Sequence, residues 1–273
     1  MDHTCEKPRW DASCKRLCRL RISSDGTIED SAPGMLQVDF ANERVGGGVL
    51  ESGCVQEEIR FVICPELIVA RLFTEMLQDN ECLIVNGAER FSDYVGYSDS
   101  FKWAGNYEDQ TPRDNWGRLC TEIVAIDALK QTGSINQYAA HYIRRELNKA
   151  YIGFHSKDIN SPQNLPAVAT GNWGCGAFGG DRELKSILQI MAASVANRDM
   201  VYFTFGDKEF AKTLFDLHSL LKGTDFRIKE LWKMICKYKE VLNDEPTTTV
   251  FEYVYEWLKA REHYGRDSAG NKV

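Results

Sequence analysis

Residues 35 to 61, MLQVDFANERVGGGVLESGCVQEEIRF, join a strand pattern to a helix pattern through three consecutive glycines. MLQVDFAN alternates apolar and polar residues, as a partly buried strand does. From Gln56 the residues are those of a helix, which we expect to continue to Leu77 and to break or restart at Pro65. Because glycine lets a backbone approach a ligand closely, the segment between strand and helix is a candidate binding loop.

Strand and helix patterns alternate through the rest of the chain. A DG turn at 25–26 lies between residues of strand type, and residues 91–118, rich in aromatic and polar side chains, predict a hairpin or a long excursion that contacts substrate. The last third predicts three amphipathic helices, at 208–223, 226–242 and 250–265. Further strands are expected at 82–87, 121–129, 167–174 and 201–207, with helices at 135–154 and 181–198. This order predicts an α/β sheet with additional C-terminal helices.

The composition is that of a globular protein. The 273 residues, of which 43% are hydrophobic, suffice for one large domain or a domain with a helical appendage. No run of about 18 apolar residues predicts a membrane span, and the start MDHTCEKPRW lacks the apolar core of a signal peptide, so we expect an intracellular protein. A formal net charge of −7 argues against a broad basic surface for nucleic acid.

The cysteines and histidines form no recognisable site. Nine cysteines are scattered without a CxxC pair, and five histidines do not cluster near them. Neither a zinc site nor a disulfide framework is therefore visible, and we interpret the cysteines as reduced thiols.

Two glycine-rich loops are the candidate ligand sites. In α/β sheets, ligands bind outside the carboxyl ends of strands, where loops meet helix N-termini. Besides the glycine triplet, GNWGCGAFGGD at 171–181 lies between a strand pattern and a helix pattern. Free backbone N–H groups of two such loops could hold a diphosphate without a lysine. The alternative is that each loop is only a tight turn between strand and helix.

Glu57 and Glu58 stand at the start of the helix that follows the first loop. Side chains one step apart on a helix diverge by about 100° and cannot share one proton tightly, so we expect them to have different roles. One alternative is that both only complement the helix dipole. A diphosphate bound nearby would raise the pKa of a carboxyl and keep it protonated as a general acid.

These motifs resemble the catalytic macrodomain of the poly(ADP-ribose) glycohydrolase family, in which a glycine triplet is followed after six to eight residues by QEE. The spacing here is seven. The resemblance covers roughly two thirds of the chain, through RLCTEIVAIDAL, RRELNKAYIGF, TGNWGCGAFGGD and VYFTFGD. It implies a macrodomain-like mixed sheet flanked by helices, with additional C-terminal helices. The implied activity is hydrolysis of ribose–ribose O-glycosidic bonds in poly(ADP-ribose), releasing ADP-ribose mainly from chain ends and sparing the bond to protein.

The resemblance also assigns roles to individual residues. Glu58 matches the catalytic glutamate and Glu57 matches its neighbour that orients the ribose, with Asp39 beside them as the third catalytic residue. The implied substrate contacts are Gln56, Asn42, Gly47 and Gly48 at the catalytic ribose, Asn172, Gly176, Ala177 and Phe178 at the diphosphate, and Ile28, Glu29, Tyr97 and Phe205 at the adenosine half.

The implied chemistry needs one acid. When the glycosidic bond breaks, positive charge develops on the ribose and the leaving 2′ oxygen needs a proton. Glu58 would donate it, then stabilise the cation as a carboxylate and act as base toward water, while Glu57 holds hydroxyl groups in place. No metal and no cofactor is required.

The implied partners are poly(ADP-ribose) and poly-ADP-ribosylated proteins, without direct DNA binding or membrane contact. We expect a monomer in the nucleus, the cytoplasm or both, with a role in the DNA damage response. Two alternatives remain open. One is a macrodomain that binds ADP-ribose or polymer ends with weak or no cleavage, and the other is a nucleotide-binding scaffold whose carboxylates are structural.

We expect residues 1–20 to be an N-terminal remnant and residues 21–273 to form the glycohydrolase macrodomain, C-terminal helices included. Catalytic fragments of the family carry a helical accessory region ahead of the macrodomain, whereas only about 26 residues precede TIEDS here. We therefore expect this chain to bind ADP-ribose but to cleave the polymer more slowly than a form with that region.

Overall fold

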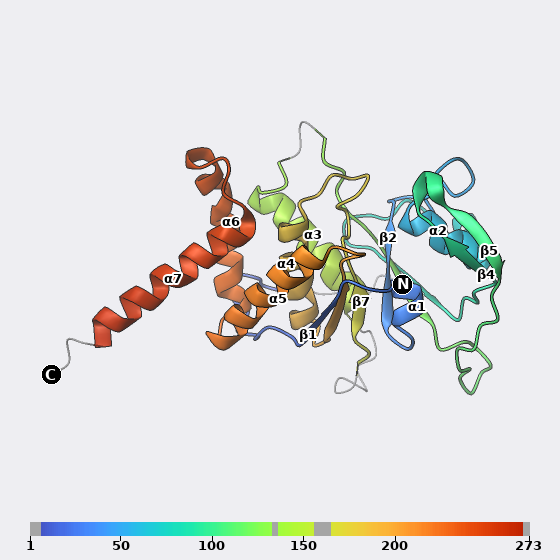
Figure 1. The fold of residues 1–273 in the computed structure, drawn as a ribbon, viewed down its shortest axis with the longest axis horizontal. Coiled ribbons are helices and arrows are strands. Elements are labelled where there is room, and N and C mark those ends of the chain that lie inside the picture. The colour runs from blue at the N-terminus through green and yellow to red at the C-terminus, as the bar shows by residue number, and fades with distance from the viewer. Residues whose placement is uncertain (1–6, 133–135, 156–164, 270–273) are drawn as a thin grey trace.

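A mixed β-sheet forms the centre of the molecule (Figure 1). The structure, a computed structural model, describes residues 7–132, 136–155 and 165–269. Within these ranges the sheet has six strands, and the edge strand β3 runs antiparallel to its neighbour β6 while the other pairings are parallel. In order across the sheet, the strands are β1 (Leu20–Ser23), β8 (Met200–Phe203), β7 (Val168–Thr170), β2 (Leu36–Ala41), β6 (Glu122–Asp127) and β3 (Leu83–Asn86).

Helices cover both faces of this sheet. Figure 1 shows α3 and α4 on one side of β2, with α1 and α2 on the other. A hairpin stands beside α2 and consists of β4 (Ser92–Val95), the short 3-10 helix η2 (Ser98–Ser100) and β5 (Lys102–Asn106). The remaining helices are α1 (Ile28–Ser31), α2 (Gln56–Ile63), the 3-10 helix η1 (Pro65–Leu72), α3 (Ala140–Phe154), α4 (Arg182–Val195), α5 (Lys208–Gly223), α6 (Ile228–Asp244) and α7 (Val250–Ala269).

The alternation of side chains along β2 directs one acidic residue toward α2. Leu36 and Val38 pack in the larger core, with residues of α3 and α4. Ala41 packs in a smaller core with Phe61 of α2. Successive side chains of a strand point to opposite faces, and Asp39 has the same parity as Ala41. Asp39 therefore points toward the layer that contains α2.

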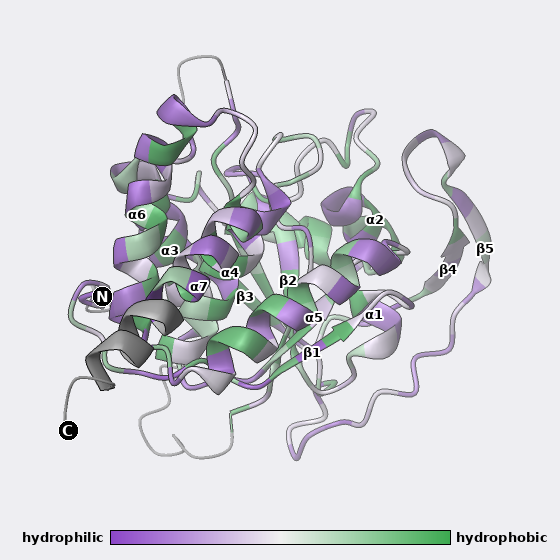
Figure 2. Cartoon of the chain, turned by 60° about the vertical axis from the view of Figure 1, so that its left-hand side comes forward, coloured by the Kyte–Doolittle hydropathy of each residue, from purple (hydrophilic) through white to green (hydrophobic). Residues whose placement is uncertain are grey.

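The predicted α/β fold is confirmed, including the mixed sheet and the helices that follow it. Strands form at the five predicted positions, and the segment from 91 contains the predicted hairpin. The three C-terminal helices also form where their apolar periodicity predicts them. Figure 2 shows hydrophobic and hydrophilic residues alternating along α5 and α6, as expected for helices with one face on the core.

The strand residues expected after the DG turn form the short helix α1 instead, so that prediction is wrong. Thr27 caps this helix, because its Oγ1 accepts a hydrogen bond from the Asp30 N–H at 3.3 Å. A helix of four residues is too short to show apolar periodicity in the sequence.

The helix predicted from Gln56 to Leu77 ends early. The chain does restart at Pro65, but as the 3-10 helix η1, which ends at Leu72. Beyond it, the Leu77 N–H donates to the carbonyl of Glu43 at 2.8 Å, so the chain turns back toward the glycine loop. The helix predicted at 135–154 begins at Ala140, and residue 135 lies outside the described residues.

Residues ahead of β1 pack against the same core as the sheet. Trp10 is buried there, and its Nε1–H donates to Asn148 Oδ1 of α3 at 2.8 Å. Leu17 also belongs to this core. The division of the chain at residue 20 stays a prediction. In the described ranges, no helix combines the length and the apolar content that crossing a membrane requires.

Candidate active site

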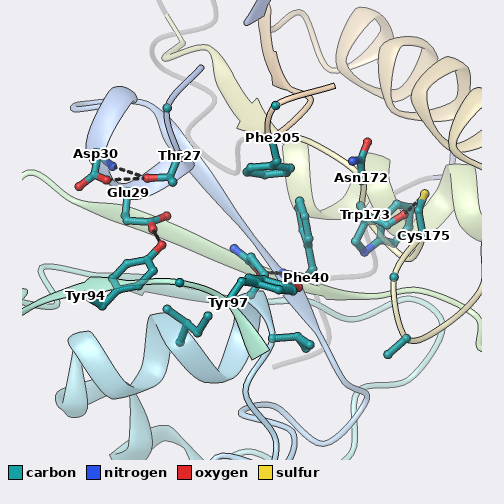
Figure 3. A pocket seen from close by; sticks show the side chains of 18 of the residues that line it. Thr27, Glu29, Asp30, Phe40, Tyr94, Tyr97, Asn172, Trp173, Cys175 and Phe205 are labelled. Atoms are coloured by element: carbon teal, nitrogen blue, oxygen red, sulfur yellow. Dashed lines mark hydrogen bonds between the residues drawn. The ribbon is translucent and has the colours of Figure 1, made fainter. Parts of the chain in front are cut away.

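A pocket of about 1040 Å³ lies at the carboxyl ends of β1, β2, β7 and β8 (Figure 3). Its walls come from the loops after these strands, from the start of α2 and from the β4 hairpin. The rings of Phe40 and Phe205 pack edge to face with 6.5 Å between their centroids, and Tyr97 lies across from Phe205. This is the position at which α/β sheets bind their ligands.

Glu57 holds the first half of the glycine loop. It is 2% exposed, and each of its carboxylate oxygens accepts one backbone hydrogen bond. Oε2 accepts from the N–H of Asn42 at 2.8 Å, and Oε1 accepts from the N–H of Gly46 at 2.5 Å. The carboxylate therefore fixes the chain between the end of β2 and the glycine triplet.

Glu58 holds the second half of the same loop. Its Oε1 accepts from the N–H of Gly48 at 3.0 Å, and its Oε2 accepts from the N–H of Val55 at 3.0 Å. The two adjacent glutamates thus have different roles, as expected from their divergence on a helix. Each one closes a different segment of the loop.

The glycines are needed because the two carboxylates occupy the space of a side chain. A Cβ on Gly47 would collide with Glu58 Oε1 and would lie 2.8 Å from Glu57 Oε2. Gly47 also has a φ of +45°, which favours glycine. A Cβ on Gly53 would lie 2.7 Å from the same oxygen of Glu58. Because Gly47 and Gly53 have no side chains, the Glu58 carboxylate can lie in contact with the loop at both positions.

Asp39 forms a buried acidic pair with Glu57. Asp39 is 1% exposed, and its carboxyl oxygens accept no hydrogen bond from the described residues. Burial raises the pKa of both carboxyls, and the proximity of Asp39 raises the pKa of Glu57 further, while the Arg60 guanidinium opposes the shift at Asp39. The two carboxyls therefore titrate together, and both keep their protons to a higher pH than exposed carboxyls do.

The second glycine-rich loop offers free donors to the pocket. Gly176, Ala177 and Phe178 line the pocket, and their backbone N–H groups donate no hydrogen bond within the described part of the chain. Successive free N–H groups of this kind form an anion-binding nest. The prediction that both loops offer such donors is wrong for the first, because the N–H groups of Gly46, Gly47 and Gly48 all bond within the protein.

The wall opposite the second loop is held by polar contacts between distant segments. The Tyr94 hydroxyl of β4 donates to Glu29 of α1 (Figure 3). Arg90, which is 6% exposed, pairs with Asp30 of α1 and with Asp93 Oδ1 at 2.7 Å. These contacts attach the hairpin to α1 across the mouth of the pocket.

The residues predicted as site residues fall into three groups. Ile28 lies in the core beneath α1. A second group forms the hydrogen-bonded network of the glycine loop and adjoins the pocket at Val55: Asp39, Asn42, Gly47, Gly48, Glu57 and Glu58. The third group lines the pocket itself: Glu29, Gln56, Tyr97, Asn172, Gly176, Ala177, Phe178 and Phe205.

Gln56 has a structural contact that the sequence did not predict. Its side-chain Oε1 accepts from the Phe40 N–H at 2.8 Å, and its Nε2 donates to the Val38 carbonyl at 3.2 Å. The side chain therefore bonds the start of α2 to the backbone of β2.

Several lining residues were not predicted. The DG turn after the first strand is a signal that could have placed Asp25 and Gly26 at the carboxyl end of the sheet. Asp93 and Tyr94 lie in the segment 91–118 and Trp173 lies in the loop 171–181, both of which the sequence predicted to contact a ligand without singling out these residues. No local signal identifies Ser24, Asp30, Arg90 and Arg182. In the described ranges, no group of three or more His, Cys, Asp or Glu side chains is placed to hold a metal ion.

The family model for the catalytic domain of poly(ADP-ribose) glycohydrolase, described as having the macrodomain fold, matches residues 7–212. The chain belongs to this family. It is 39% identical to poly(ADP-ribose) glycohydrolase 2 of Caenorhabditis elegans, over 89% of this chain and 50% of that protein. It is 35% identical to poly(ADP-ribose) glycohydrolase 1 of Arabidopsis thaliana, over 91% of this chain and 56% of that protein.

The chain thus spans about half the length of these curated relatives. Among solved structures, it resembles the crystal structure of poly(ADP-ribose) glycohydrolase from Thermomonospora curvata, with a TM-score of 0.43 and 16% identity over 77% of each chain.

Proposed function

We propose that this chain hydrolyses ribose–ribose O-glycosidic bonds in poly(ADP-ribose) and releases ADP-ribose, with Glu58 as general acid and base. One observation carries the proposal. The Glu58 carboxylate, seated against a glycine loop, adjoins one side of a pocket, and another loop that lines the same pocket has three backbone N–H groups without a partner in the described residues. An acid on one side and an anion nest on another suit a substrate in which a diphosphate stands next to a glycosidic bond.

The terminal unit of the polymer would occupy the pocket along its length. The N–H groups of Gly176, Ala177 and Phe178 would bind the diphosphate, since they have no partner within the described residues. The adenosine half would lie near Phe205 and Tyr97, whose rings suit stacking with a base. The distal ribose would then reach the glycine loop.

At the ribose, the two glutamates would act in sequence. Glu58 donates a proton to the leaving 2′ oxygen, stabilises the oxocarbenium-like ring as a carboxylate and then accepts a proton from the attacking water. Glu57, whose pKa is raised by burial and by Asp39, would hold the ribose hydroxyls beside the loop. Its two loop hydrogen bonds would keep it in place.

The first test is the variant Glu58→Gln. We expect poly(ADP-ribose) cleavage, measured as free ADP-ribose, to fall by at least about a thousandfold, because the amide keeps the shape but has no acidic proton to transfer. The affinity for ADP-ribose should stay within about twofold. Wild-type turnover by this variant would falsify the role of Glu58.

One alternative is supported by a specific observation. Both oxygens of Glu58 already accept backbone hydrogen bonds, as a purely structural carboxylate would. The chain would then bind ADP-ribose or polymer ends without cleaving them. Release of ADP-ribose by the wild-type chain excludes this alternative, and equal affinities for ADP-ribose, ADP and AMP would instead indicate a general nucleotide-binding scaffold.

We further propose that the protein acts as a monomer on poly(ADP-ribose) and poly-ADP-ribosylated proteins, without direct contact to DNA. The net charge of −7 disfavours binding to DNA. Activity in the nucleus or cytoplasm, within the DNA damage response, follows from the proposed substrate and stays a prediction.

A further inference from the structure

Arg71, on η1, contacts the glycine loop and does not line the pocket. Its Nη1–H donates to the carbonyl oxygen of Gly47 at 2.7 Å. The guanidinium is half-buried, and no carboxylate among the described residues forms an ion pair with it. The Arg71 guanidinium therefore bonds to a backbone carbonyl and not to a carboxylate.

The same peptide unit connects Arg71 to Glu58. The carbonyl of Gly47 accepts from Arg71, and the N–H on the other side of that peptide bond, which belongs to Gly48, donates to Glu58 Oε1 at 3.0 Å. A peptide unit is planar, so its C=O and N–H directions are fixed relative to each other. Whatever orients the Gly47 carbonyl also orients the hydrogen bond to Glu58.

Arg71 also restricts the glycine before this peptide. A Cβ on Gly46 would lie 3.1 Å from Arg71 Cδ and 2.9 Å from a ring carbon of Phe61, so the aliphatic stem packs against the loop. Gly46 and Gly47 have φ values of +88° and +45°. Consecutive glycines have more backbone conformations available than other residues, so this segment needs contacts that select one of them.

A hydrogen bond from a charged donor is roughly twice as strong as a neutral one. It also polarises the peptide that accepts it, which strengthens the hydrogen bond on the other side of the peptide. Without Arg71, rotation of the Gly47–Gly48 peptide would remove a donor from Glu58 Oε1 at little cost to the rest of the fold.

We propose that Arg71 is a positioning residue for the general acid Glu58 and acts through the peptide between Gly47 and Gly48. The inference rests on the proposed function of Glu58. It gives Arg71 no contact with substrate. It predicts a defect in the chemical step, because the contacts with diphosphate and adenosine come from other loops.

The test uses Arg71→Met, which keeps most of the aliphatic stem and removes the guanidinium. We expect kcat for poly(ADP-ribose) cleavage to fall by about 10- to 100-fold, since a displacement of about 1 Å in a catalytic group costs about that much. The Kd for ADP-ribose should stay within about twofold, and the melting temperature should change little because Arg71 is partly exposed. Arg71→Lys should recover part of the lost rate, because lysine keeps a cationic donor.

Arg44→Met is the matched control. Arg44 lies on the same loop, and its exposed guanidinium forms no hydrogen bond or ion pair within the described residues. A second measurement distinguishes positioning of Glu58 from stabilisation of the fold. Guanidinium ion, added far below denaturing concentrations, should restore part of the rate of Arg71→Ala. It should not change the rate of Arg44→Ala.

The outcomes distinguish this inference from the proposed function. If Arg71→Met turns over like the wild type while Glu58→Gln is inactive, Arg71 has no positioning role and Glu58 keeps its own. If Arg71→Met loses ADP-ribose binding and thermal stability in proportion to kcat, the arginine only supports the fold. An active Glu58→Gln variant overturns the proposed function itself.

Discussion

Gly47 lies against both Glu57 and Glu58, and the effect of adding a side chain there can be tested directly. In Gly47→Ala, the methyl group would collide with Glu58 Oε1, and alanine would have to adopt a φ of +45°. We expect the rate of poly(ADP-ribose) cleavage to fall by more than about a hundredfold, because either the carboxylate or the loop must move. The assay is release of ADP-ribose at saturating substrate.

Gly34→Ala is the control for backbone strain alone. Gly34 has a φ of +70°, and a Cβ there would meet no atom within 4 Å. This variant should lose about 1 kcal/mol of stability through its positive φ and keep its turnover. If Gly34→Ala and Gly47→Ala lose activity to the same extent, backbone strain and not contact with the carboxylates is the reason that position 47 requires glycine.

The raised pKa of Asp39 gives a pH prediction. Burial raises the pKa of Asp39 to about 7, whereas an unfolded aspartate has a pKa of about 4. The folded state therefore binds more protons than the unfolded state between about pH 4 and pH 7, so the free energy of unfolding falls as pH rises through this window. Below the window the contribution of Asp39 to this penalty is absent, and above it that contribution is constant, while the pKa of Glu57, raised by burial and by Asp39 to about 10, extends the fall in stability to higher pH.

Asp39→Asn removes this titration. The stability of the variant relative to the wild type should rise with pH from 5 to 7, by at most about 1.4 kcal/mol per pH unit for one proton. Denaturant unfolding at several pH values measures the difference. Parallel pH profiles for the two proteins would show that Asp39 carries no raised pKa.

At the scale of elements, the sequence predicted the parts of the site that are contiguous in the chain. The end of β2, the glycine loop and the start of α2 are joined by hydrogen bonds over 18 residues or fewer, such as that from Gln56 Nε2 to Val38 O. Strand periodicity, the glycines and the helix start each leave a local signal there. The loop after β7 was predicted for the same reason.

The other wall depends on contacts between distant segments. Tyr94 reaches Glu29 across 65 positions of sequence, and Arg90 reaches Asp30 across 60. Such pairs leave no periodicity or spacing to recognise. The helix α1 was missed for a different reason, because four residues are too few to show apolar periodicity. The restart at Pro65 was predicted, but the sequence pattern did not show that it forms a 3-10 helix ending at Leu72. Arg71 therefore became visible as a candidate only through its contact in the folded chain.

At the scale of the whole molecule, the positively charged side chains that line the pocket are paired with carboxylates. Two arginines line it within the described residues, and both are ion-paired. Arg90 pairs with Asp30 and Asp93, and Arg182 pairs with Asp207 while its guanidinium lies 4.7 Å from the ring centre of Phe210. The molecule as a whole carries a net charge of −7. In the proposed function, backbone N–H groups would therefore be the main donors to the diphosphate.

This arrangement predicts a shallow dependence of binding on salt. Each phosphate neutralised by a lysine or arginine releases bound counterions and adds roughly 0.7 to 0.9 to the slope of log Kd against log salt concentration. Neutral N–H donors such as those of Gly176 and Ala177 release none. We expect a slope below about 1 for ADP-ribose, measured by calorimetry between low and physiological salt, with uncharged adenosine as the reference ligand. A slope near 2 or above would mean that the ion pairs of Arg90 and Arg182 open to bind the diphosphate, which would move phosphate recognition from the backbone of the second loop to these two side chains.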